Sequence, residues 1–149
     1  MKLKIDKQKD CEEVEIIVRC NEIDQQLESL IEHIQSYCIT ILHKKNDLVF
    51  HLSADVIFYF ESIDEKTFTY TKNEVYDCEL KLYELEEKLK QTSYCRVSKS
   101  CILNTSVVAH VRPLIGGRLE ATLDNEEKVI VNRHYLPMFK MKFGLEVNV

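Results

Sequence analysis

The sequence contains no tryptophan and few residues that break regular structure, with only three Gly and two Pro among 149 residues. This composition excludes the Gly- and Pro-rich segments that remain disordered, and we expect one folded unit with a core of its own. A long hydrophobic run is also missing, because residues 1–16 alternate charged residues with short apolar steps. That pattern argues against a signal peptide or a membrane span, and we expect a cytoplasmic protein.

Sequence motifs of catalysis and metal binding are missing as well. The six cysteines form no C-x-x-C pair, and the five histidines show no ligand spacing. There is no P-loop, G-x-G-x-x-G, G-x-S-x-G or H-E-x-x-H motif. We therefore expect no enzyme activity, no metal and no cofactor. Cys95 and Cys101 flank a polar stretch and leave a thiol-based sensor open as an alternative, although a reactive thiol needs an exposed, electropositive setting.

Charge is distributed unevenly along the chain. The formal net charge is −5, which by itself argues against binding to nucleic acid. Residues 91–149, however, carry eight Lys and Arg against five Asp and Glu, whereas both earlier parts are acidic. An approaching polyanion responds to the local potential, so the last third of the chain is the candidate binding region.

The first forty residues predict a small extension. Residues 13–20, "EVEIIVRC", are rich in β-branched residues and predict a strand. Residues 21–37 have apolar side chains at helical spacing and predict an amphipathic helix with Asn21 as its N-cap. We expect residues 1–42 to form this strand and helix, separate from a domain that spans residues 43–149.

From residue 40 onward the apolar pattern has mainly a period of two. It predicts short strands interrupted by one helix at 79–91 and followed by a final helix that ends at Gly144. The fold class is thus mainly β, with antiparallel strands and few long loops. Helix-turn-helix readout is not indicated, because the basic third is rich in strands. The expected strands lie near 40–44, 48–52, 56–62, 67–72, 75–78, 107–114, 118–123 and 128–133.

The stretch "RVSKSCILN" at 96–104 combines two cations and two hydroxyls with an apolar run. We expect its apolar part to anchor in the sheet, Asn104 to end the run by a side-chain bond to the backbone, and "SKS" to project into solvent. Lys99 is suited to a guanine edge or a phosphate, and Arg133 can offer a bidentate fork to guanine.

Together, "YCRVSKSCILN" and "VRPLIGGRLEATLDNEEKVIVNRHYLPMFKMKFG" resemble the LytTR DNA-binding domain of bacterial transcription regulators, over roughly residues 43–149. Residues 13–24 resemble the small stand-alone subgroup. The resemblance implies ten short strands in an elongated antiparallel arrangement whose loops enter successive major grooves of DNA. By position in the motif, it assigns base contacts to Lys66 or Thr67, to Lys99 and to Arg133.

We expect the remaining site residues to contact phosphates or to support the loops; they are Arg96, Ser98, Ser100, Arg118 and His134. Arg96 has the weakest claim, because strand alternation could turn it inward to pair with an acid. The chain departs from the family pattern at Asn132, at Asn125-Glu126 and at Gly116-Gly117. Glu126 stands where the final turn usually has glycine, which can change the turn type.

Double-stranded promoter DNA is the expected partner, bound by a homodimer on repeated half-sites. Residues 1–42 are expected to form the dimer interface, to dock a membrane-bound inhibitor of the kind the resemblance implies, or only to pack on the chain's own sheet. A protein-interaction module that does not bind DNA is the alternative function, and salt-dependent DNA binding would separate the two.

Overall fold

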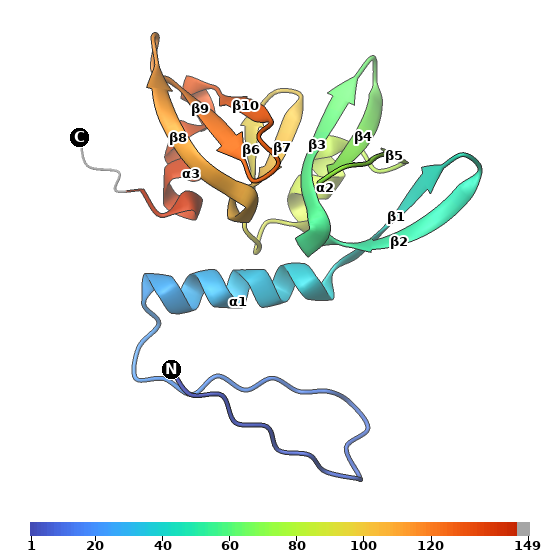
Figure 1. Cartoon of the computed structure of the whole chain (residues 1–149), viewed down its shortest axis with the longest axis vertical. Helices are drawn as coiled ribbons and strands as arrows, with labels where there is room; N and C mark the ends of the chain where they lie inside the picture. The colour runs from blue at the N-terminus through green and yellow to red at the C-terminus, as the bar shows by residue number, and fades with distance from the viewer. Residues whose placement is uncertain (146–149) are drawn as a thin grey trace.

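The structure, a computed structural model, describes residues 1–145 (Figure 1). This part of the chain contains ten short strands and three α-helices, with three single turns of 3-10 helix at Ala54–Val56, Thr105–Val107 and Arg133–Tyr135. The strands are β1 (Thr40–Lys45), β2 (Leu48–Ser53), β3 (Ile57–Ile63), β4 (Lys66–Thr71), β5 (Val75–Cys78), β6 (Tyr94–Ser98), β7 (Cys101–Asn104), β8 (Val108–Leu114), β9 (Arg118–Leu123) and β10 (Lys128–Val131). The helices are α1 (Gln25–Cys38), α2 (Leu82–Lys88) and α3 (Leu136–Phe143).

The strands form two antiparallel sheets, which confirms the expected mainly β fold. One sheet has seven strands in the order β2-β1-β5-β4-β3-β7-β6, and the other has three in the order β10-β9-β8. The sheets meet where the backbone amide of Asn132, just after β10, donates to the carbonyl of Val97 on β6 at 2.9 Å. The end of β10 is thereby fixed beside the turn that follows β6.

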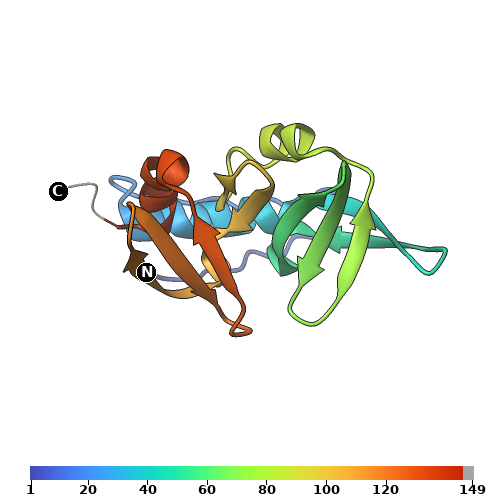
Figure 2. The same ribbon diagram turned by 90° about the horizontal axis from the view of Figure 1, so that it is seen from above.

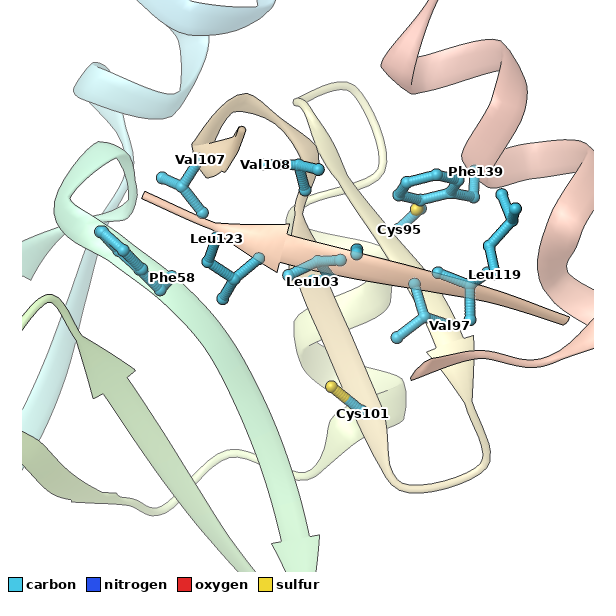
Figure 3. Close-up of a cluster of buried hydrophobic side chains, with 12 residues drawn as sticks. Phe58, Cys95, Val97, Cys101, Leu103, Val107, Val108, Leu119, Leu123 and Phe139 are labelled. Atoms are coloured by element: carbon cyan, nitrogen blue, oxygen red, sulfur yellow. The ribbon is translucent and has the colours of Figure 1, made fainter. Parts of the chain in front are cut away.

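Two hydrophobic clusters form the core, one on each side of the β6–β7 hairpin. In the first, shown in Figure 3, alternate residues of β9 point inward with Phe139 of α3 and Leu103 of β7. In the second, Leu85 and Leu89 at the α2 end pack toward Phe60 of β3. The period-two pattern buries alternate residues along strands such as β1, β4 and β9, as a half-buried sheet requires, whereas all four residues of β7 are buried.

Helix α1 lies along the side of the sheets opposite the tips of the β3–β4 and β8–β9 hairpins (Figure 1). It begins after Asp24, whose carboxylate accepts a hydrogen bond from the amide of Leu27 at 2.8 Å. The prediction of Asn21 as N-cap was therefore wrong, because Asp24 is correctly spaced to satisfy a free amide of the first turn. Leu27 is buried, so α1 packs against the sheets of the same chain.

Two other sequence predictions need correction. Residues 13–20 are extended and exposed and do not form the predicted strand within the described residues, because no neighbouring backbone pairs with them. The helix predicted over 79–91 covers only Leu82–Lys88, since Leu89 already leaves helical geometry at φ −106° and ψ 9°. The last helix ends as predicted, at Gly144 with φ 91°.

Asn104 ends β7 as the centre of a buried hydrogen-bond network. Its Oδ1 accepts from the hydroxyl of Ser93 at 2.7 Å and from the amide and hydroxyl of Ser106 at 3.0 and 2.7 Å. Its Nδ2 donates to the carbonyl of Ile57 at 3.0 Å. The expected side-chain bond to the backbone is confirmed, and residues 101–104 are all buried.

His43 is a buried imidazole on β1, with 1% of its surface exposed and its ring between those of Phe60 and Tyr76. Neither ring nitrogen has a hydrogen-bond partner among the described residues. Burial lowers the pKa of His43 to about 4, and the nearby backbone of Ile41 offsets this only in part.

Acid should therefore destabilise the fold through His43. The unfolded chain binds a proton near pH 6.5 and the folded chain only near pH 4, so stability is lost as pH falls through this window. We expect a loss of about 2 kcal/mol between pH 7 and pH 5, measured by urea unfolding. His43→Leu should flatten this slope, whereas His51→Gln, a change at an exposed position on β2, should leave it intact. Equal slopes in wild type and His43→Leu would refute the assignment.

Candidate nucleic-acid interface

Three hairpin turns lie along one edge of the molecule, on the side opposite α1 (Figure 1), and Figure 2 views the molecule from this side. They are the β3–β4 turn at 64–65, the β6–β7 turn at 99–100 and the β8–β9 turn at 115–117. Antiparallel alternation accounts for this arrangement, because β3, β6 and β8 all run toward that edge. Lys66, Lys99 and Arg118 are exposed at or beside these turns.

Arg96 holds the β6–β7 turn by hydrogen bonds to its backbone carbonyls. Its Nε donates to the carbonyl of Ser98 at 3.0 Å, and its Nη2 donates to the carbonyl of Lys99 at 2.5 Å. Its Nη1 is paired with the carboxylate of Glu86 on α2 at 2.8 Å. All three guanidinium nitrogens are engaged, so Arg96 supports the loop and has little left to offer a phosphate.

Lys99 is exposed at the tip of this braced turn. The amide of Ser100 donates to the hydroxyl of Ser98 at 3.2 Å, which closes the turn on the other side. The expectation is confirmed for Lys99 and Ser100, which are exposed, and for "CIL", which is buried, but Ser98 is half-buried at the end of β6. A cation on a turn held by Arg96 loses little backbone entropy on binding.

Arg133 follows β10 and lies against the β8–β9 turn. A Cβ atom added to Gly117 would stand 3.2 Å from Cδ of Arg133, tighter than an ordinary contact. Gly117 therefore has two roles: it adopts φ 74°, and its missing side chain leaves room for the arginine. Nothing in the spacing of residues 117 and 133 in the sequence indicates that they touch.

The other predicted site residues are placed unequally. Thr67 is only 5% exposed on β4, so Lys66 is the residue of that pair that DNA could reach. Arg118 is exposed, with its Nε 3.4 Å from the carbonyl of Ile115. His134 is exposed with its ring edge-on to Tyr135 at 5.0 Å, and Ser98 is half-buried.

Within residues 1–145, some of the basic side chains form ion pairs with acidic residues and others do not. Arg112 and Lys128 both lie near the carboxylate of Glu120, at 3.2 and 3.7 Å, and their charge is partly cancelled. Lys99 and Arg133 form no ion pair with any described residue.

The β3–β4 turn is the least basic of the three, because the acidic residues Asp64 and Glu65 occupy its tip. Both residues have a positive φ, 50° for Asp64 and 67° for Glu65. Glu126 likewise adopts a positive φ, 72°, in the β9–β10 turn, where a glycine would be unstrained.

The cysteines at the motif are poorly placed for redox sensing. Cys95 and Cys101 are buried, and burial raises the pKa of each thiol to about 12. A thiol of this kind is almost entirely protonated at neutral pH and shielded from oxidants. Among the described residues no group of three His, Cys, Asp or Glu side chains could hold a metal ion, and no helix there is long and apolar enough to cross a membrane.

An antiparallel β-scaffold that presents unpaired cations on adjacent turns defines a class of DNA reader that uses strands and loops instead of a recognition helix. The LytTr DNA-binding domain family matches residues 47–144 of the chain. The chain therefore belongs to this family of DNA-binding domains.

Comparisons with individual proteins agree with this assignment. The chain is 31% identical to the sensory transduction protein LytT of Enterococcus faecalis over 96 residues, which are 64% of this chain but only 40% of that protein. It is 25% identical to an HTH-type transcriptional regulator of Staphylococcus aureus over 132 residues, covering 83% and 89% of the two chains. A solved LytTr DNA-binding domain from Bacillus cereus shares the fold, with a TM-score of 0.66, 24% identity and coverage of 71% of this chain and 97% of that one.

Proposed function

We propose that this protein is a cytoplasmic, sequence-specific transcriptional regulator that reads double-stranded promoter DNA through the turns of its β-scaffold. The observation that carries the proposal is the row of exposed turns with Lys99, Arg118 and Arg133, on the edge opposite α1. A row of turns can follow the groove of a duplex while the sheets remain outside it. The family membership supports DNA as the ligand.

Within this row, Lys99 and Arg133 are the proposed readers of base edges. Arg133 leaves the sheet beside Gly117 and carries a guanidinium suited to the O6 and N7 acceptors of guanine. Phosphate contacts are proposed for Arg118, His134, Ser98 and Ser100, which lie around the same turns. Lys66 is proposed to make an outer contact, and Arg96 supports the loop through its bonds to residues 98 and 99.

A homodimer on repeated half-sites is the proposed binding unit. One domain presents few base contacts, and a second copy raises the effective concentration at the neighbouring half-site. The side that carries α1 is free to join two copies, because it faces away from the turns. A membrane-bound inhibitor remains a prediction from the resemblance.

Selection from a random duplex library with the full chain tests the proposed function. A single sequence motif should emerge, and its affinity should exceed that of a scrambled duplex by roughly a thousandfold or more. Both affinities should fall with rising salt as counterions are released. Equal affinity for selected and scrambled duplexes would remove the sequence-specific role, and binding independent of salt would favour the protein-interaction alternative.

A further inference from the structure

The segment at 13–20 is an exposed apolar stretch for which the structure provides no partner among residues 1–145. Val14 is 90% exposed, and Ile16 and Ile17 are 62% and 64% exposed. The segment is extended, and its β-branched residues favour a strand. Backbone in such a stretch is a template for pairing with another strand.

The two faces of this segment differ in character. When it is extended, successive side chains point to opposite sides. Val14, Ile16 and Val18 then share one face with Cys20, and this face is entirely apolar. The other face carries Glu13, Glu15, Ile17 and Arg19, with acids at one end and a base at the other.

This charge order makes the segment complementary to itself in one orientation. In an antiparallel pair with Ile17 facing its own copy, Glu15 of each copy lies opposite Arg19 of the other. On the apolar face the same register sets Ile16 opposite Val18 and Val14 opposite Cys20. Opposite charges that face each other across strands stabilise a pair, whereas parallel pairing would stack like charges.

We propose that residues 13–20 are the dimerisation strand, which pairs antiparallel with residues 13–20 of a second copy of this chain. The inference deepens the proposed function, since it rests on the homodimer proposed there and assigns it an interface. Only residues 21–24 separate the segment from α1, so the pair stays on the side away from the basic turns. The two DNA-reading edges are thereby left free.

A lone two-stranded ribbon is only marginally stable in water, so its apolar face needs cover. Helix α1 offers Leu30 and Tyr37, two turns apart, with 36% and 67% of their surface exposed. Ile23, just before the helix, is 62% exposed and adds to this apolar surface. We place the apolar face of the ribbon against these side chains.

A charge exchange on the full chain, without DNA, tests the pairing by sedimentation equilibrium. Arg19→Glu sets two acids opposite each other twice per dimer and should raise the dimer Kd roughly tenfold. Adding Glu15→Arg to it restores both pairs and should return Kd to the wild-type value. The matched control, Glu13→Arg with Arg19→Glu, has the same net charge but leaves Glu15 facing the acid introduced at position 19, and it should stay weak. All three positions are exposed, so these substitutions should not destabilise the fold.

Crosslinking gives a second measure that does not depend on charge. In a chain with the exposed Cys11, Cys20 and Cys38 changed to Ser, Ile17→Cys places two thiols opposite each other, within reach of a disulfide. Glu13→Cys in the same background separates them by roughly 27 Å, eight residues along the ribbon. Mild oxidation should link the first variant and not the second.

The outcomes are separable from those of the DNA experiment. A chain that stays monomeric, equal Kd values for the two double variants, or equal crosslinking at positions 13 and 17 would overturn the strand pairing. A dimer with the expected charge response that shows no DNA preference would instead overturn the proposed function and leave the pairing supported.

Discussion

Replacing Arg133 by alanine should relax sequence preference at one base pair by roughly 1–3 kcal/mol, about 5- to 150-fold in relative affinity. The expectation follows from its exposed side chain, which forms no ion pair with the described residues and lies beside Gly117 at the proposed DNA-binding edge. Losing a bidentate fork removes discrimination at the base it contacts and little elsewhere. Competition binding with duplexes that vary one position at a time measures the change.

Two controls separate base reading from general attraction. Arg118→Ala should weaken binding to all sequences alike and reduce the salt dependence, as expected for a phosphate contact. Lys128→Ala removes an exposed cation on β10 that is already near Glu120, so it should have little effect on preference. An Arg133→Ala variant that keeps the wild-type preference at every position would refute the base contact.

Asn104→Ala should lower the free energy of unfolding by about 3 kcal/mol, a shift in Tm of roughly 6–12 °C for a chain of this size. The side chain is fully buried and bonds to Ser93, Ser106 and the carbonyl of Ile57. In the variant the buried hydroxyl of Ser93 loses its partner, whereas the carbonyl of Ile57 keeps the bond from the hydroxyl of Tyr94 at 2.6 Å. A buried polar group that loses its partner costs more than the bond itself contributed. Chemical and thermal unfolding measure the loss.

Asn125→Ala is the matched control. Asn125 also bonds two backbone groups, the carbonyl of Lys72 and the amide of Glu127, but it does so in an exposed turn where water can replace it. Its loss should cost below about 1 kcal/mol. Similar losses for the two asparagines would show that the buried network is not what stabilises the end of β7.

Local patterns in the sequence predicted most of the fold. Period-two runs from residue 40 onward indicated the strands, and Gly144 indicated the end of the last helix, because these signals depend on neighbours within a few residues. The same reasoning failed at 13–20, where the residues favour a strand but a strand needs a partner. It also misplaced the start of α1, since Asn21 and Asp24 are both good N-caps and only the helix register separates them.

The candidate site was predicted residue by residue, but its arrangement was not. Lys99 and Arg133 were named from their motifs, yet the contact of Arg133 with Gly117 joins residues far apart in the chain. The sequence did not show whether Lys66 or Thr67 is accessible to DNA. The alternation of side chains along β4 buries Thr67 and exposes Lys66. Glu86, which engages Arg96, carries no local signal that marks it among the acids of α2.

The sequence alone thus determined the class of fold, the basic character of the last third and the turn residues that present cations, since all of these depend on short-range pattern and composition. Only the tertiary structure decided which cations are free, because ion pairs such as that of Arg112 with Glu120 form across strands. It also decided that the turns share one edge and that α1 lies on the other. Those facts follow from strand order and packing, which depend on contacts between residues distant in sequence.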